Sequence, residues 1–165
     1  MQTYDDFEWT SADELARLAG EATPWHYYEQ TAVHFDVPGK SGRVVPVSSA
    51  GGGGQLVPFG PLHVVAAVQP GGDPGSVDSD ARLAVLDREL NALGVHSVRA
   101  VGSSLDRRHA EESRAILGLS DQRARELGLQ FGQVAVFAWN GPRWSLLSCA
   151  TDRQTHRGWK WIAAE

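Results

Sequence analysis

Leucines spaced by three and four residues are the strongest helix signal in the chain. They lie in a segment that begins near residue 78, and their spacing places them on one face of an amphipathic helix. The leucines are Leu83, Leu86, Leu90 and Leu93, with Gly94 directly after them. Ser11 and Glu14 have the spacing of a capping box and predict a shorter helix over 11–20. Ser120 predicts the start of a third helix. Its inward-facing residues are expected to be Ala124, Leu127 and Phe131.

Alternating and continuous apolar runs predict the strands. Residues 31–37 alternate and predict a strand, with 42–47 as its hairpin partner. Residues 62–68 form a nearly continuous apolar run, short enough for a central strand buried on both faces. Asn140-Gly141 is typical of a tight hairpin turn. Further strands are expected over 95–101, 114–119, 133–139 and 144–149.

The order of these elements from residue 62 onward is β-α-β-β-α-β, followed by one more strand. This order matches the split βαβ, ferredoxin-like plan. We therefore predict an α/β (α+β) fold: a mixed β-sheet with a ferredoxin-like β-α-β-β-α-β core and helices mainly on one face. An N-terminal helix and hairpin are added to this core.

The length of the chain predicts a single domain. A domain of about 150 residues buries roughly two-thirds of its unfolded surface, so one core is enough for residues 1–165. Within this domain, a leader helix and hairpin (1–50) precede a Gly-rich connector (51–61). The α/β core (62–149) and an aromatic and basic tail (150–165) follow.

Charge and composition limit which cellular compartment and which kinds of partner we expect for this protein. The net charge of −5 disfavours binding to duplex nucleic acid, which requires a basic surface. The one cysteine, Cys149, cannot form an internal disulfide, and the N-terminus lacks the basic and apolar segments of a signal peptide. We therefore expect a cytoplasmic protein. No run approaches the ~18 apolar residues of a membrane span, so no membrane partner is expected.

Short sequence blocks within 62–140 resemble one bacterial family. The blocks are Gln69-Pro70, Ala100-Val101-Gly102, Glu111-Glu112-Ser113, Ile116-Leu117-Gly118-Leu119-Ser120 and the run from Phe131 to Trp139. On these blocks the body resembles the family known as domain of unknown function 3293. Glu111 and Gln133 fall on typical polar positions of that family. Gln69 stands where asparagine is usual, and His109 where tryptophan is common. The resemblance implies bacterial origin and a compact α/β domain, and it implies no reaction.

The loop over 69–76 is a candidate site for an anion. It joins the end of a buried strand to the start of a helix, where free backbone amides and the helix dipole favour negative charge. A dinucleotide fingerprint and a phosphate-loop lysine are both absent from it. The alternative is that its glycines and prolines only turn the chain. The candidate ligand-binding residues of this loop are Gln69, Gly71, Gly72 and Ser76.

Glu111 and His109 are candidate catalytic residues. A carboxylate beside a histidine can act as a general acid or base when burial raises its pKa toward neutrality. Gln133 is a further candidate for ligand binding, because its amide can orient a substrate. The alternatives are a solvated charged turn over 107–112 and a structural hydrogen bond from Gln133 to the backbone.

The sequence predicts neither a metal site nor a cofactor. Six histidines stand at positions 26, 34, 63, 96, 109 and 156, and none pair at the spacing of a helical metal site. Cys149 closes an apolar run. A lone cysteine in that position is more often a small buried hydrophobe than a nucleophile.

Two functions share the same candidate residues. The first is an accessory protein that binds a small anionic ligand between the 69–76 loop, Glu111 and Gln133. The second is a cofactor-independent enzyme that uses Glu111 as general acid or base.

The aromatic residues support a third function, a protein-interaction module. Trp159, Trp161 and Tyr27 would be its exposed anchors, since interface hot spots favour such side chains. The alternative for the two tryptophans is burial on one face of a closing strand. The sequence alone leaves the choice among the three functions open.

Overall fold

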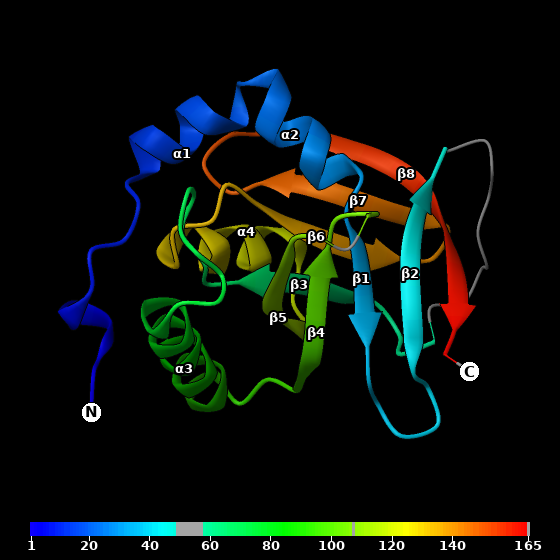
Figure 1. The fold of residues 1–165 in the computed structure, drawn as a ribbon, viewed down its shortest axis with the longest axis horizontal. Helices are drawn as coiled ribbons and strands as arrows, with labels where there is room; N and C mark the ends of the chain where they lie inside the picture. The colour runs from blue at the N-terminus through cyan, green and yellow to red at the C-terminus, as the bar shows by residue number, and fades with distance from the viewer. Residues whose placement is uncertain (49–57, 107, 165) are drawn as a thin grey trace.

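The computed structural model of this chain describes residues 1–48, 58–106 and 108–164 (Figure 1). A short 3-10 helix, η1 (Tyr4–Asp6), comes first. The α-helices are α1 (Ala12–Ala19), α2 (Ala22–Glu29), α3 (Val77–Leu93) and α4 (Asp121–Gln130). The strands are β1 (Ala32–Phe35), β2 (Gly42–Val47), β3 (Leu62–Ala66), β4 (Ser97–Ser103), β5 (Ala110–Leu117), β6 (Ala135–Asn140), β7 (Arg143–Ser148) and β8 (Gln154–Ala163).

The strands close into an antiparallel barrel in the order β1-β2-β8-β7-β6-β3-β5-β4, with β4 paired back to β1. The predicted mixed, ferredoxin-like sheet is therefore wrong, although the elements from β3 to β7 follow one another as predicted. The error has a physical cause. An open sheet would leave β4 and β7 as unpaired edges, which natural proteins cover or pair. Here β1, β2 and β8 pair with those edges and with one another.

The leader and the tail are thus parts of the barrel wall. Val33 of β1 lies opposite Gly102 of β4, and Val44 of β2 lies opposite Trp161 of β8. The prediction that 1–165 form one domain stays a prediction. The predicted connector, 51–61, lies outside the described residues except for 58–61.

Three predicted helices begin or end at an expected cap residue. Gly94 closes α3 with a φ of 70°, a left-handed conformation that glycine adopts readily. The Ser120 side chain accepts a hydrogen bond from the Arg123 amide at the start of α4. In the same way, Ser11 caps α1 by accepting from the Glu14 amide.

The helix α2 was missed because its sequence is rich in aromatic residues and Pro24 suggests a break. The proline lies in the first turn of α2, where a helix tolerates it. Trp25 is the buried residue of this helix, and its Nε1 donates to Thr155 Oγ1 of β8 at 2.8 Å. Figure 1 shows α1 and α2 lying across one end of the barrel.

Helices α3 and α4 cover the outer face of one half of the barrel wall. The residues of this outer layer are Val65, Ala67, Val85, Leu86, Leu90, Ile116, Ala124, Leu127, Phe131, Val136, Ala138, Leu147 and Cys149. Burial of these side chains supplies the hydrophobic free energy that holds both helices on the sheet. No helix within the described residues has the length and apolarity needed to cross a lipid bilayer.

Aromatic rings pack the barrel interior at the end away from α1 and α2. The cluster, which we call the aromatic plug, comprises Phe35, Phe59, Trp139, Trp144, Trp159 and Trp161. Trp159 of β8 is buried in this cluster and Trp161 packs against it partly buried, so both rings lie on one face of the closing strand, as the alternative predicted. These two rings cannot be exposed interaction anchors. Of the three predicted anchors, Tyr27 is exposed, at 67%.

Candidate functional site

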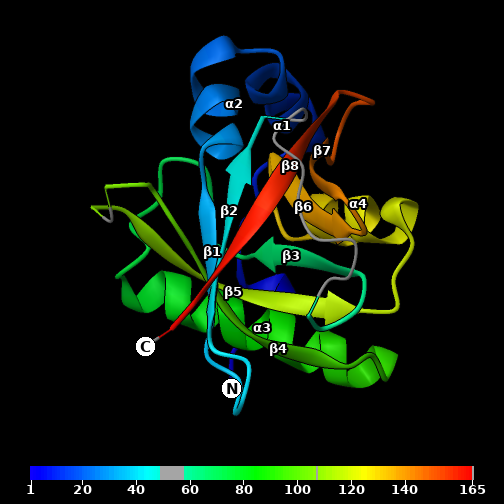
Figure 2. The same cartoon turned by 90° about the vertical axis from the view of Figure 1, so that its right-hand side faces the viewer.

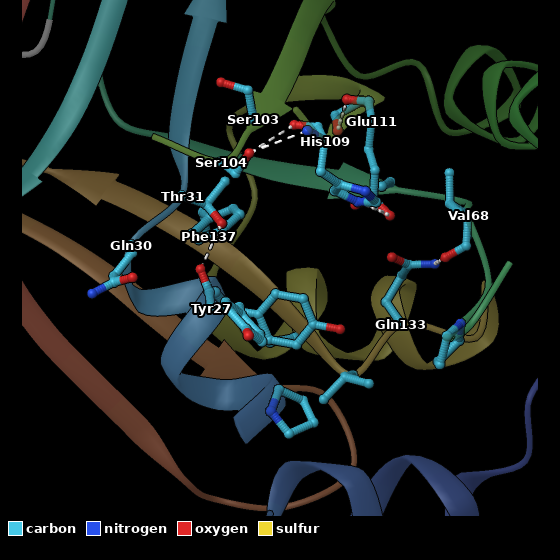
Figure 3. Close-up of a pocket in the computed structure, with 18 of the residues that line it drawn as sticks. Tyr27, Gln30, Thr31, Val68, Ser103, Ser104, His109, Glu111, Gln133 and Phe137 are labelled. Atoms are coloured by element: carbon cyan, nitrogen blue, oxygen red, sulfur yellow. Dashed lines mark hydrogen bonds and ion pairs between the residues drawn. The ribbon is translucent and has the colours of Figure 1, made fainter. Parts of the chain in front are cut away.

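A cavity of about 680 Å³ opens at the barrel end that α2 overlies (Figure 3). We call it the mouth cavity. Its wall is formed by α2, β3, the β4–β5 turn, the start of β6 and Leu146 of β7. The volume lies within the range of roughly 300–1,000 Å³ found for small-molecule sites.

The mouth cavity exists because the inward-facing side chains near this end are small. Strand alternation points Ala66, Gly102, Ser113 and Ala135 into the barrel, one from each of four adjacent strands. At the opposite end the same strands contribute Leu62, Val98, Leu117 and Trp139. These large side chains fill the far end of the barrel and form the floor of the mouth cavity.

Gln133 presents a hydrogen-bond acceptor to the mouth cavity. Its Nε2 donates to the carbonyl oxygens of Val68 and Phe131, each at 3.0 Å. Only the amide nitrogen can donate to carbonyls, so these two bonds fix which end of the amide faces the cavity. Figure 3 shows the oxygen directed into the cavity. Among the described residues, no donor reaches that oxygen, although Gln133 is only 8% exposed.

Gln69 lines the same cavity but has no hydrogen-bonding capacity left. Its Oε1 accepts from both the amide and the hydroxyl of Thr10, each at 2.9 Å. Its Nε2 donates to the carbonyls of Ala67 and Phe131. Gln69 therefore ties the N-terminal segment to the barrel and offers nothing to a ligand.

Glu111 lies within β5 and points into the mouth cavity, not in a turn before a strand as the sequence predicted. Burial raises the pKa of its carboxyl, while nearby His109 acts in the opposite direction. The Glu111 Oε1 lies 3.7 Å from His109 Nε2. The next residue, Glu112, faces outward and pairs with Arg99. The predicted solvated turn therefore does not describe these two acids.

Tyr28 also lines the mouth cavity, although it was not among the candidate site residues predicted from the sequence. Burial, and then the charge of Glu111, raise the pKa of its hydroxyl to about 12. Tyr28 therefore remains a neutral hydroxyl near the Glu111 carboxylate at physiological pH. Tyr28 lies on α2, the helix that the sequence did not predict.

The predicted anion loop is only partly in the mouth cavity. Gly71 and Gly72 line it, and Gly71 adopts a positive φ of 76°. Ser76 does not line it and instead caps α3 by accepting from the Ser79 amide. Asp73 Oδ1 accepts from the Gly75 amide, which adds a carboxylate at the helix start. The prediction of an anionic ligand there stays untested.

Cys149 and the histidines do not assemble into a reactive or metal centre. Burial raises the pKa of the Cys149 thiol to about 12, which disfavours the reactive thiolate. Within 1–48, 58–106 and 108–164, no group of three or more metal-binding side chains comes together. His63 and His156 instead bond to Asp121 and Ser145, each at 2.7 Å.

The predicted site residues that do meet are Gln69, Gly71, Gly72, His109, Glu111 and Gln133. The residues that reasoning from the sequence missed are the small side chains of the wall. The alternation of Glu111, Ser113 and Ala115 carried a usable signal, because residues two apart in a strand share one face. A carboxylate on the same face as a buried alanine indicates an inward-facing polar position.

Comparison with known proteins gives one match. Residues 65–136 match the family described as protein of unknown function (DUF3293). The curated proteins and the solved structures give no significant match. The matched segment runs from β3 into β6 and carries Gln69, Glu111 and Gln133 of the mouth cavity. The resemblance to domain of unknown function 3293 is therefore confirmed over residues 65–136.

Proposed function

We propose that the barrel mouth binds a small molecule that presents N–H donors, of amine or amidine type. The observation that carries this proposal is the Gln133 amide, which two backbone carbonyls hold with its oxygen toward the mouth cavity. No donor among the described residues bonds to this oxygen, which faces the open cavity. A ligand N–H could therefore hydrogen-bond to it directly.

The polarity of the surrounding groups supports a donor more than an anion. In Figure 3 the Glu111 carboxylate and the Gln133 oxygen point toward one another. Two acceptors that face each other are satisfied by a donor group placed between them. An anionic ligand, as the sequence suggested, would add a third negative end. We therefore favour the opposite ligand polarity.

Benzamidine and benzoate test this proposal, because they share a ring and differ in the sign of their charge. We expect benzamidine to raise the melting temperature of the protein with increasing concentration, because a ligand of the folded state stabilises it. Benzoate at the same concentrations should leave the melting temperature unchanged. Equal shifts with both compounds, or no shift with benzamidine, would refute the proposed polarity.

Two variants locate the binding. Gln133→Met removes the acceptor at similar length and should abolish the benzamidine shift. Gln122→Met is the matched control, because Gln122 lies exposed on α4 and bonds to Glu126. The shift is compared with each variant's own ligand-free melting temperature, so a loss of stability in Gln133→Met does not obscure the result.

A second candidate function is an enzyme that uses Glu111 as general acid or base. The raised pKa of Glu111 supports it, because a proton-transfer group works best when its pKa lies near the operating pH. If the enzyme acts on a reactive amine or amidine that binds in the mouth cavity, Glu111→Gln should abolish turnover of that compound. Binding that depends on Gln133 should persist in this variant. Unchanged turnover would eliminate this candidate.

A further inference from the structure

A second hollow lies on the outside of the barrel, away from the helices. Strands β1, β2 and β8 face the viewer in Figure 2, and no helix lies in front of them. On this face a groove of about 190 Å³ is bordered by Ala32, His34, Arg43, Val45, Ser103, Ser104, Leu105, Lys160 and Ile162. We call it the outer groove. Its volume is below that of drug-sized ligand sites and suits a single small group.

Strand register gathers basic side chains in the outer groove. His34 of β1 lies directly opposite Arg43 of β2. Lys160 of β8 lies opposite Val45, which places it diagonally across from Arg43. Directly opposed and diagonal neighbours on one face of a sheet are close enough to interact, and like charges there are destabilising.

Among the described residues, no carboxylate borders the outer groove to balance these charges. None of its bordering residues is Asp or Glu. Within the described part of the chain, no carboxylate lies within ion-pair distance of Arg43 or Lys160. The nearby Arg99, by contrast, pairs with Glu112 on the adjacent strand. Asp36, which follows β1, accepts from the Ser41 hydroxyl. Among residues 1–48, 58–106 and 108–164, the two cations therefore have no acidic partner.

We propose that the outer groove binds a phosphate-type oxyanion. Arg43 supplies a planar fork of donors that matches oxyanion geometry, and Lys160 supplies a second positive charge. The Ser103 hydroxyl, 2.9 Å from His34 Nε2, adds a polar contact on the groove wall. Because the chain carries a net charge of −5, anions are repelled overall, and this local cluster is what attracts one.

Titration of the 15N-labelled protein with inorganic phosphate, followed by NMR, tests the proposal. We expect saturable shifts of the backbone amides of Arg43, Ser103, Ser104 and Lys160, and no comparable shifts with chloride. Arg43→Gln and Lys160→Gln should each weaken binding by about tenfold or more, since each removes a charge-assisted contact. Arg99→Gln is the control and should bind phosphate normally. Scattered shifts, or shifts that persist in both groove variants, would overturn the proposal.

A second experiment distinguishes a lipid headgroup from a soluble phosphate compound as the bound oxyanion. Phosphatidylcholine vesicles, with and without phosphatidic acid, are sedimented with the protein. Sedimentation that needs both phosphatidic acid and Arg43 assigns the groove to a lipid headgroup. Binding of inorganic phosphate without sedimentation assigns it to a soluble phosphate compound. If the protein shows neither phosphate binding nor Arg43-dependent sedimentation, the proposed oxyanion site is wrong.

Discussion

The two ends of the barrel interior are built from the same strands, but one end is packed with side chains and the other is open. At one end β6 contributes Trp139, which is fully buried against neighbouring aromatic rings. At the other end the same strand contributes Ala135, and the space is left open as the mouth cavity. The size of inward-facing residues, and not the backbone, therefore separates the structural end from the candidate site.

The largest expected effect comes from emptying the packed end. Trp139→Ala should lower the free energy of unfolding by about 3–5 kcal/mol, because it removes a large ring and leaves a cavity. Chemical denaturation measures this loss. Ser113→Ala at the mouth is the comparison, and it should change stability by less than about 1 kcal/mol. Similar losses in the two variants would contradict the division between the ends.

The next effect separates the two glutamines of the mouth. Gln69→Ala should cost about 1–3 kcal/mol, since it leaves the buried partners of its amide without bonds. We expect the benzamidine shift to persist in this variant, measured against its own melting temperature. Loss of binding in Gln69→Ala would instead show that this side chain contacts the ligand.

A smaller effect on stability should follow when the open end is filled. The backbone φ of Gly102 is ordinary, and an added Cβ would meet Thr31 Cγ2 at 3.5 Å, an ordinary contact. Gly102→Leu should therefore fold, with a stability change within about 1 kcal/mol, yet abolish benzamidine binding by occupying the cavity. Gly102→Ala should retain binding. If Gly102→Leu binds as well as the parent chain, the ligand does not occupy the mouth cavity.

The smallest effect concerns the pH dependence of stability. Because the folded state raises the pKa of Glu111, it holds that proton more tightly than the unfolded chain does. The resulting stabilisation is complete below the unfolded pKa and is lost as pH rises through the folded one. Glu111→Gln cannot titrate, so its stability relative to the parent should increase between about pH 4 and pH 8. A constant difference across that interval would contradict the raised pKa.

Local signals predicted most elements of this fold, though not α2, and they did not predict its closure. The helix α3 and its cap followed from leucine spacing and Gly94, which are neighbours in sequence. Closure depends on Val33 meeting Gly102 and Val44 meeting Trp161, pairs that lie far apart along the chain. An open sheet has the same element order as this part of the barrel, so the order could not distinguish them.

The sequence likewise predicted several residues of the candidate site but not the role of each one. Glu111 and Gln133 were singled out as polar residues beside apolar runs, and both line the mouth cavity. Ser76 was grouped with them because it shares a loop with Gly72, but it turns toward α3. The different roles of Gln69 and Gln133 depend on which carbonyls and amides surround each side chain. That information exists only in three dimensions.

One stretch of chain, the end of β4 and the turn after it, borders both hollows. Ser103, Ser104 and Leu105 line the mouth cavity on one side and the outer groove on the other. The turn is held by a hydrogen bond from the Ser104 amide to the His109 carbonyl at 3.0 Å. An occupant that displaced this partition would also change the wall of the other hollow. Thermodynamic linkage then requires that each occupant alter the affinity of the other by the same factor, so this partition would couple a donor-bearing guest to an oxyanion.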